Sequence, residues 1–304
     1  YKEKKFKVKF KSASKIDEKD IKDFDVVIQL AAFSNDPFGK LDPKKFYKPT
    51  TKYTLKIAKI CKKLNKKFIF PSSCSVYGYG KSIFSENSKV SPLTDYSKNK
   101  IEIEKGLKKL KSRKFNPIIL RLATVYGVSP RIRLDVVINM LTSMVVSTKK
   151  IKLNSNGLAW RPHLNIKDVA KIIENFIRLR NKDIKNSVYN IGSDNNNFKI
   201  IDIAKKINKI LPSSKIEFTN PKDKNSLVSD KKIDDGVDKR SYRVSFKRIK
   251  KVFPTYKFTN INYGIRKLIK ELKSYRMNKQ KFLNVDFYRL QKLDQINSKK
   301  KIIV

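Results

Sequence analysis

Short apolar segments alternate with longer amphipathic stretches along this chain. Apolar segments bounded by Pro, Gly, Ser or Asn predict β-strands at residues 26–30, 67–71, 117–122 and 188–191. The stretches between them repeat apolar residues at helical spacing, which predicts helices within 41–64, over 94–110 and over 168–179. Because parallel strands need crossover helices, the pattern predicts an α/β fold with a doubly wound parallel sheet.

The character of the sequence changes after residue 190. We expect a helix over 198–211, a strand over 215–218, a polar loop over 220–239, and helices over 261–275 and 282–296. Residues 129–159 separate two sheet-forming regions by more than a crossover requires, and 136–146 read as a buried helix. This organisation predicts a first domain of 1–128 and 160–195, a smaller lobe of 129–159 and 196–297, and a tail of 298–304.

Charge is the unusual feature of the composition. The 304 residues include 72 Lys and Arg against 27 Asp and Glu, a formal net charge of +45, which suggests nucleic acid or an anionic membrane as a partner. The lysines, however, occur in nearly every segment and form no basic block with interleaved aromatic residues. We therefore expect no specific nucleic-acid partner. No apolar run is long enough to predict a membrane span, so we expect no membrane partner either.

The two cysteines bear on the setting of the protein. Cys61 and Cys74 have no paired Cys or His spacing, so neither a disulfide nor a metal site is expected, and a cytoplasmic location fits. The highly charged N-terminus has neither the apolar core of a signal peptide nor an initiating Met. We expect the chain to begin partway through its gene.

A tyrosine and a lysine four residues apart are the first candidates for chemistry. On the helix predicted over 94–110, Tyr96 and Lys100 share one face. A free tyrosine has a pKa of about 10, so it becomes a base at neutral pH only where a nearby ammonium favours the phenolate. The spacing alone is weak, because it recurs at Tyr1/Lys5, Tyr77/Lys81, Tyr263/Lys267, Tyr275/Lys279 and Tyr288/Lys292. The setting singles out Tyr96, which lies between the predicted strands of 67–71 and 117–122.

The order of motifs along the chain is more specific than any single pair. The motifs are VVIQLAA at 26–32, SSCSVYG at 72–78, YSKNK at 96–100, RLATVYG at 121–127, WRPHLNIKDVA at 160–170 and DKRSYRVSF at 238–246. This order resembles the extended short-chain dehydrogenase/reductases, in particular the NAD-dependent epimerase/dehydratase family. The resemblance covers nearly the whole chain, and it implies a Rossmann-type sheet with a smaller C-terminal substrate-binding lobe.

The resemblance also implies roles for individual residues. It implies catalysis by Ser73, Tyr96 and Lys100. It implies that the cofactor, NAD with NADP still open, contacts Leu30, Ala31, Ala32, Ser72, Tyr96 and Lys100. It implies that a nucleotide-sugar substrate contacts Ser75, Thr124, Arg161 and Arg240, the guanidinium group being suited to bidentate phosphate contacts. Relatives often pair through two helices beside the active-site strand, which implies a homodimer.

The sequence departs from the family pattern in three ways. The glycine-rich turn that receives the cofactor pyrophosphate is expected before residue 1, so the first strand of the sheet is not in the sequence. Dehydratases carry an Asp-Glu pair where this chain has Cys74 and Ser75, which disfavours a 4,6-dehydratase. Thr124 stands where relatives usually have Asn, so the sugar specificity is open.

Several alternatives remain open from the sequence. The chain is either a NAD-dependent nucleotide-sugar epimerase or oxidoreductase, or a catalytically inactive fragment or basic binding protein for nucleic acid or a protein partner. Reduction of a non-sugar carbonyl is a third reading, which Arg161 and Arg240 weaken. Arg121 is either a cleft residue or a structural ion-pair partner, and His163 is expected to be a hydrogen-bonded structural histidine.

Overall fold

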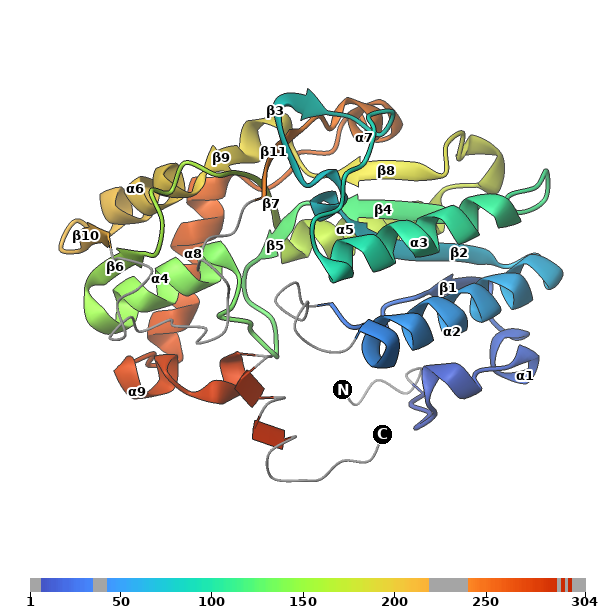
Figure 1. Cartoon of the computed structure of the whole chain (residues 1–304), viewed down its shortest axis with the longest axis horizontal. Coiled ribbons are helices and arrows are strands. Elements are labelled where there is room, and N and C mark those ends of the chain that lie inside the picture. The colour runs from blue at the N-terminus through green and yellow to red at the C-terminus, as the bar shows by residue number, and fades with distance from the viewer. Residues whose placement is uncertain (1–6, 35–42, 219–239, 289–290, 293–294, 297–304) are drawn as a thin grey trace.

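The fold is known from a computed structural model that describes residues 7–34, 43–218, 240–288, 291–292 and 295–296. Its main sheet is parallel and four-stranded, in the order β1 (Val26–Ile28), β2 (Lys67–Ser73), β4 (Ile118–Leu122) and β8 (Val188–Ile191) (Figure 1). These are the strands predicted from the apolar segments, so the predicted α/β class and parallel sheet are confirmed.

Helices cover both faces of this sheet because successive strand side chains point to opposite faces. Phe68 and Phe70 of β2 pack with apolar residues of α2 (Pro43–Lys63) and α3 (Asp95–Leu110). Ile69 packs on the other face, in a cluster with residues of α5 (Ile166–Arg178). In Figure 1, α2 and α3 lie in front of the sheet. The result is a doubly wound layer structure.

A second apolar cluster lies beside the sheet, where the helices gather at the left of Figure 1. Its elements are α4 (Val137–Thr148), β6 (Lys150–Leu153), α6 (Ile200–Ile210), β10 (Lys215–Phe218), α8 (Ile261–Ser274) and α9 (Lys279–Phe282). Strands β6 and β10 pair in parallel. The predicted buried helix and the predicted strand of 215–218 are therefore present in this part of the chain.

Short strands that the sequence did not predict connect the two regions. β5 (Thr124–Tyr126) pairs in parallel with β7 (Trp160–Asn165), which pairs antiparallel with β9 (Asn197–Lys199). β3 (Tyr79–Phe84) pairs in parallel with β11 (Ser241–Val244). The chain also contains α1 (Glu18–Ile21) and α7 (Lys247–Val252), and 3-10 turns at Ala13–Lys15, Cys74–Tyr77, Asn181–Asp183, Asp194–Asn196 and Val285–Phe287.

Two features of the C-terminal half bear on the sequence predictions. The single helix predicted over 282–296 is wrong, because α9 ends at Phe282 and the Asn284 side chain accepts from the Asp286 amide to start a 3-10 turn. Tyr242, Val244 and Ile249 belong to the cluster of the main sheet and not to that of the second lobe. Phe246 joins the same cluster, and Tyr126 of the predicted first domain lies in the cluster of the second lobe, so the domain boundaries stay a prediction that the clusters support only in part. The loop of 220–239 and the tail of 298–304 lie outside the described residues.

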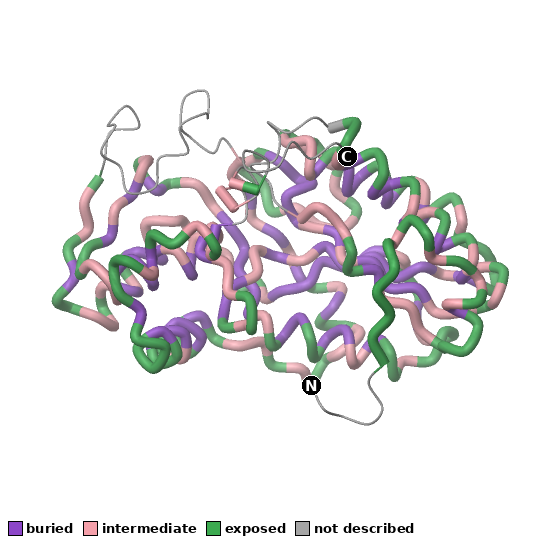
Figure 2. The backbone as a smooth tube through the Cα atoms, turned by 90° about the horizontal axis from the view of Figure 1, so that it is seen from below, coloured by how far each residue is buried: buried purple, intermediate pink, exposed green. Residues whose placement is uncertain are grey.

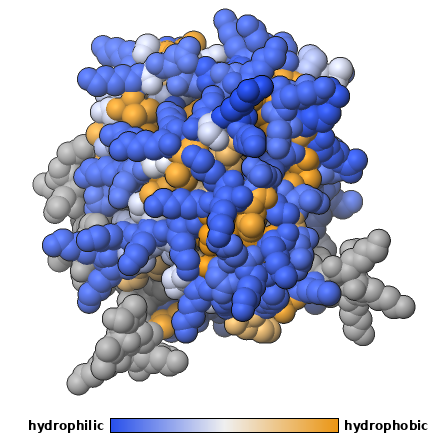
Figure 3. All heavy atoms as spheres, turned by 90° about the vertical axis from the view of Figure 1, so that its right-hand side faces the viewer, coloured by the Kyte–Doolittle hydropathy of each residue, from blue (hydrophilic) through white to orange (hydrophobic). Residues whose placement is uncertain are grey.

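The buried residues run through the middle of the molecule in Figure 2, and the exposed residues lie along its outside. The face in Figure 3, the right-hand end of Figure 1, is covered mainly by hydrophilic side chains with small apolar areas between them. Within the described residues, no helix combines the length and the apolar character needed to cross a membrane.

Candidate active site

A cavity of about 540 Å³ lies at the carboxyl ends of the parallel strands. The residues that follow β1, the end of β2 and the end of β4 line one side of it, and α3 contributes Tyr96 and Lys100. The segment from Ser129 to Asn139, which leads into the first turn of α4, also lines it. Ligands of open parallel sheets bind at this end of the strands. The cavity is therefore the candidate active site.

Most of the residues implied by the family resemblance line this one cavity. They are Leu30, Ala32, Ser72, Ser73, Ser75, Tyr96, Lys100, Thr124, Arg161 and Arg240. Ala31 does not line it, and its carbonyl accepts hydrogen bonds from the Gln29 side chain at 2.8 Å and the Tyr53 hydroxyl at 3.0 Å. The fold thus brings together side chains from six separate motifs of the sequence.

The start of α3 fixes the position of Tyr96. Thr94 and Ser97 form a capping box, in which the Ser97 hydroxyl accepts from the Thr94 amide at 3.1 Å and the Ser97 amide donates back to the Thr94 side chain. Tyr96 is the second residue of α3 and lines the cavity beside Ser73, whose hydroxyl acts to lower the pKa of Tyr96. The Ser73 oxygen also accepts from the Ser75 amide at 3.1 Å, so its own proton can be donated to Tyr96.

The electrostatics of Tyr96 set the condition for any base chemistry. Burial raises the pKa of Tyr96 to about 12, while the Ser73 hydrogen bond and the positive charge of Arg133 act to lower it. Tyr96 is therefore protonated at neutral pH in this structure. Cations and hydrogen-bond donors in the cavity are the groups that can stabilise its phenolate.

Lys100 is a buried cation next to Tyr96. Its ammonium donates to the Pro71 carbonyl at 2.9 Å and lies 4.5 Å from the Phe70 ring centroid and 5.6 Å from the Tyr96 ring centroid. Burial lowers the pKa of Lys100 to about 8, and the Glu104 carboxylate raises it. Lys100 is consequently charged at neutral pH but close to losing its proton.

Two arginines approach the cavity from β7 and from the start of β11. Arg161 donates to the carbonyl oxygens of Trp160, at 2.8 Å, and of Arg240, and its guanidinium carbon lies 5.2 Å from the Tyr242 ring centroid. Burial lowers the pKa of Arg240, and a hydrogen bond with Tyr242 raises it. Since a guanidinium group keeps its proton under these conditions, the cavity carries fixed positive charge.

Comparison with known proteins agrees with this geometry. The model of the NAD dependent epimerase/dehydratase family matches residues 6–192, more than half of the 304 residues. The chain belongs to the NAD-dependent epimerase/dehydratase family. The family's own cofactor is NAD, which is the cofactor predicted from the sequence.

Individual members of the family cover different shares of the chain. The ADP-L-glycero-D-manno-heptose-6-epimerase of Brachyspira hyodysenteriae is 30% identical over 186 residues, which are 58% of this chain and 57% of that protein. The bifunctional polymyxin resistance protein ArnA of Wigglesworthia glossinidia brevipalpis is 24% identical over 225 residues, 67% of this chain and 34% of that protein. The chain thus spans less than two thirds of the length of these curated relatives.

A solved structure shows the same fold. The UDP-glucuronic acid 4-epimerase of Bacillus cereus, in complex with UDP-glucuronic acid and NAD, superposes with a TM-score of 0.71 at 23% identity. The match covers 87% of this chain and 81% of the other. The Rossmann-type fold predicted from the sequence is therefore confirmed for this chain.

The two residues after Ser73 differ from one another in access to the cavity. The Ser75 hydroxyl is buried and lines the cavity, and within the described residues it makes no hydrogen bond, so it is placed to contact a ligand. Cys74 is buried, its sulfur hydrogen bonds to the Arg121 carbonyl at 3.2 Å, and burial raises the pKa of the thiol. Cys74 therefore does not supply an acidic group to the cavity.

Sequence reasoning missed two arginines of the cavity, Arg131 and Arg133. Arg133 forms a bidentate ion pair with Asp135, at 2.8 and 3.0 Å, and donates to the Ser34 carbonyl at 3.3 Å. It thereby ties the loop before α4 to the segment after β1. The signal was present as charged residues in the Arg-Ile-Arg-Leu-Asp stretch of 131–135, but it belonged to no recognised motif.

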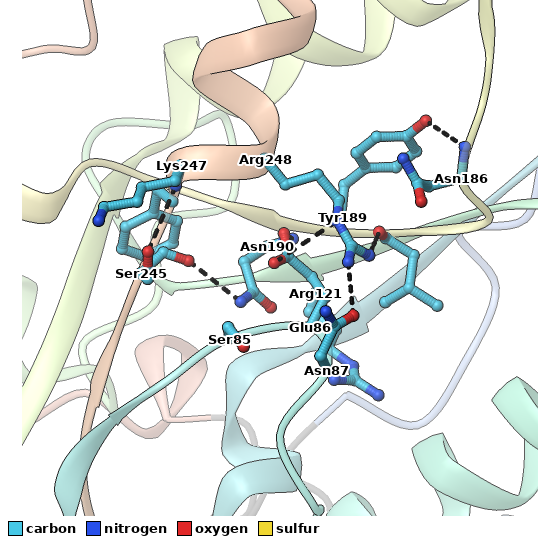
Figure 4. A network of polar contacts seen from close by, with 12 residues as sticks. Ser85, Glu86, Asn87, Arg121, Asn186, Tyr189, Asn190, Ser245, Lys247 and Arg248 are labelled. Carbon is cyan, nitrogen blue, oxygen red and sulfur yellow. Dashed lines mark hydrogen bonds and ion pairs between the residues drawn. The ribbon is translucent and has the colours of Figure 1, made fainter.

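Arg121, in contrast, is a structural ion-pair partner. Its guanidinium group binds Glu104 of α3 at 2.7 to 3.2 Å and donates to the Tyr77 hydroxyl at 3.0 Å, and both charged side chains are almost fully buried. Tyr77 donates to Asn190 at 2.8 Å. Around Asn190 the network continues to Glu86, Arg248 and Ser245 (Figure 4). It locks β4 and β8 to α3 and leaves Arg121 outside the cavity lining.

His163 is buried in β7, as predicted, but it is not hydrogen bonded: among the described residues neither ring nitrogen has a partner. Burial, and then Arg161, lowers the pKa of His163 to about 3 from 6.5. The pKa of His163 is lower in the folded state than in the unfolded chain, so the folded protein favours the neutral ring. The resulting contribution to the free energy of unfolding is complete above pH 6.5 and is lost as the pH falls toward 3.

We therefore expect acid to destabilise the protein through His163. Between about pH 7 and pH 5 the wild type should lose about 2 kcal/mol more free energy of unfolding than His163→Leu. Urea denaturation at the two pH values measures this difference. Equal losses in the two proteins would show that His163 is protonated in the folded state without cost.

Proposed function

We propose that this protein is an epimerase or oxidoreductase that acts on a nucleotide sugar through Ser73, Tyr96 and Lys100. One observation carries the proposal: the three side chains meet at the carboxyl ends of β1, β2 and β4, in the cavity that Arg161 and Arg240 also line. Paired hydroxyl and phenol groups suit proton transfer from a sugar hydroxyl, and arginines suit the diphosphate of a nucleotide. This placement also argues against a non-sugar carbonyl substrate.

In the proposed reaction Tyr96 takes the proton of the substrate hydroxyl. Ser73 donates a hydrogen bond to the same substrate oxygen, since its own oxygen is already held by the Ser75 amide. Lys100 supplies positive charge beside the Tyr96 ring, and the charge of Arg133 also favours the phenolate. These groups act against the burial that keeps Tyr96 protonated, and the reaction requires the phenolate that they favour.

Bound NAD would accept a hydride from the sugar carbon whose hydroxyl group gives its proton to Tyr96. The residues present fit the nicotinamide and ribose end of NAD, because Tyr96 and Lys100 offer a hydroxyl and an ammonium beside the strand ends. Leu30 and Ala32 provide the wall after β1. In an epimerase Tyr96 would return the proton to the sugar oxygen after the oxidised sugar has turned its other face to the cofactor. In a reductase Tyr96 would donate a proton to the oxygen of the carbonyl that is reduced.

A 4,6-dehydratase mechanism has less support. It needs an Asp-Glu pair directly after Ser73, where this chain has Cys74 and Ser75. The Cys74 thiol is turned to the Arg121 carbonyl, and Ser75 offers a hydroxyl that cannot serve as a carboxylic acid. We therefore propose that Ser75 and Thr124 bind the sugar without acting as acid or base.

Calorimetric titration with UDP-, GDP-, dTDP- and ADP-linked sugars tests the proposal. Arg161→Gln and Arg240→Gln should each weaken binding of the preferred nucleotide sugar about tenfold to a hundredfold, because each removes a charge-assisted phosphate contact. Arg266→Gln is the matched control, since Arg266 is exposed on α8 and its loss changes net charge equally. Equal affinity in all variants, together with salt-dependent binding of generic DNA, would favour a basic binding protein instead.

Two further parts of the proposal concern the setting of the protein. Cys61 and Cys74 are both free and buried, which supports a reducing cytoplasmic location. A nucleotide-sugar enzyme there would supply activated sugars for polysaccharide or glycoside synthesis. We also propose a homodimer that pairs through α2 and α3, which pack against each other on one face of the sheet. Sedimentation at several protein concentrations tests the dimer.

A further inference from the structure

We propose that Glu104 is a positioning residue of this site, holding the end of β2 through Ser72 and keeping a negative charge one helical turn from Lys100. Glu104 lies on α3 four residues after Lys100 and eight after Tyr96, so all three side chains project from one face of the helix. It does not line the cavity, and it acts on the site through its neighbours.

The first contact fixes the strand end. The Ser72 hydroxyl donates to Glu104 at 2.6 Å, in a fully buried setting. Ser72 immediately precedes Ser73, which meets Tyr96, and it immediately follows Pro71, whose carbonyl accepts from Lys100 at 2.9 Å. One carboxylate therefore sets the position of the backbone that holds both catalytic partners of Tyr96.

The second contact is electrostatic. The ammonium of Lys100 is buried against Phe70 and the Tyr96 ring, and the Glu104 carboxylate favours its charged form. Arg121 of β4 forms a buried ion pair with Glu104, and the positive charge of Arg133 acts on Tyr96. Through Arg121 and Tyr77, Glu104 is linked to the polar network around Asn190, part of which Figure 4 shows.

The inference rests on the proposed function in one respect, since a charged Lys100 affects turnover only if Tyr96 exchanges the substrate proton. The contact itself can be tested without turnover. Lysine carrying ¹³C at the ε position reports each ammonium titration by nuclear magnetic resonance, and Lys100→Arg identifies the Lys100 signal.

Glu104→Gln should lower the pKa of Lys100 from about 8 by about half a unit or more, because the favourable carboxylate is removed. Glu102→Gln is the matched control: it makes the same charge change on the exposed side of α3 and should leave Lys100 unchanged. If Glu104→Gln alone does not fold, the variant Glu104→Gln/Arg121→Met removes both charges of the buried ion pair, and the pKa of Lys100 should fall in it as well.

Turnover distinguishes failure of this inference from failure of the proposed function. Near pH 8, Glu104→Gln should slow turnover by about twofold or more, since a loss of half a unit from a pKa of about 8 roughly halves the charged fraction of Lys100. A wild type that is active while Lys100 titrates identically in Glu104→Gln and Glu102→Gln overturns the inference alone. A pKa that falls as expected in a protein without turnover of any nucleotide sugar supports the contact and overturns the proposed function.

Discussion

Tyr96→Phe is expected to reduce turnover of the preferred nucleotide sugar by about 10³-fold, the middle of the range for loss of a general acid or base. The substitution removes the hydroxyl that meets Ser73 and keeps the aromatic ring that packs beside Lys100. The free energy of unfolding and the affinity for nucleotide sugar should change little, so the loss should appear in kcat. Conversion of sugar isomers followed by chromatography measures it.

The chain offers a matched control for this prediction. Tyr263 and Lys267 have the same spacing on α8, but Tyr263 is exposed and does not line the cavity. Tyr263→Phe should therefore leave turnover at the wild-type rate. Tyr96→Phe with undiminished kcat would remove Tyr96 from the reaction, whatever other residues contributed.

Arg121→Met is expected to lower the free energy of unfolding by about 3–5 kcal/mol, because it leaves a buried carboxylate without its partner. Of the side chains that now hydrogen bond to Glu104, only the Ser72 hydroxyl would remain. Tyr77 would lose the Arg121 guanidinium donor, which now lies 3.0 Å from its hydroxyl. Urea denaturation followed by circular dichroism measures the change.

An exposed ion pair provides the comparison. Arg178 binds Glu174 at 2.8 Å with side-chain exposures of 76% and 38%, against 3% and 2% for Arg121 and Glu104. Arg178→Met should cost less than about 1 kcal/mol, since water screens exposed pairs and replaces their contacts. Similar losses for the two arginine variants would mean that the Arg121 pair is not the link between β4 and α3.

The main sheet and its helices could be predicted because burial imposes a pattern on the sequence. Phe68, Ile69 and Phe70 are all buried, since both faces of a parallel strand are covered, and such a run of apolar residues is easily recognised. The strands of the connecting region carry no such pattern. β5 and β9 are three residues long, and β7 contains Arg161, Pro162 and His163. Their pairing depends on partners remote in sequence.

The candidate site was predictable where motifs carried it and not where tertiary contacts did. Family resemblance pointed to Ser73, Tyr96 and Arg161, all of which line the cavity. Arg133 was missed because its position depends on the Ser34 carbonyl, 99 residues away. The missing hydrogen bonds of His163 were also beyond prediction, since they follow from how β5 and β7 pair across the chain.

Conversion of the nucleotide sugar tests the central claim most directly. The protein is mixed with NAD or its reduced form and each nucleotide sugar of the panel, the sugars are separated by chromatography, and the absorbance of reduced nicotinamide is followed in parallel. With the preferred sugar the wild type should form a new nucleotide sugar, without net change in nicotinamide if it is an epimerase and with a matching change if it is an oxidoreductase. Tyr96→Phe should form almost none, and Tyr263→Phe should match the wild type. Equal conversion by the wild type and Tyr96→Phe would contradict the account, as would conversion of no sugar by the wild type.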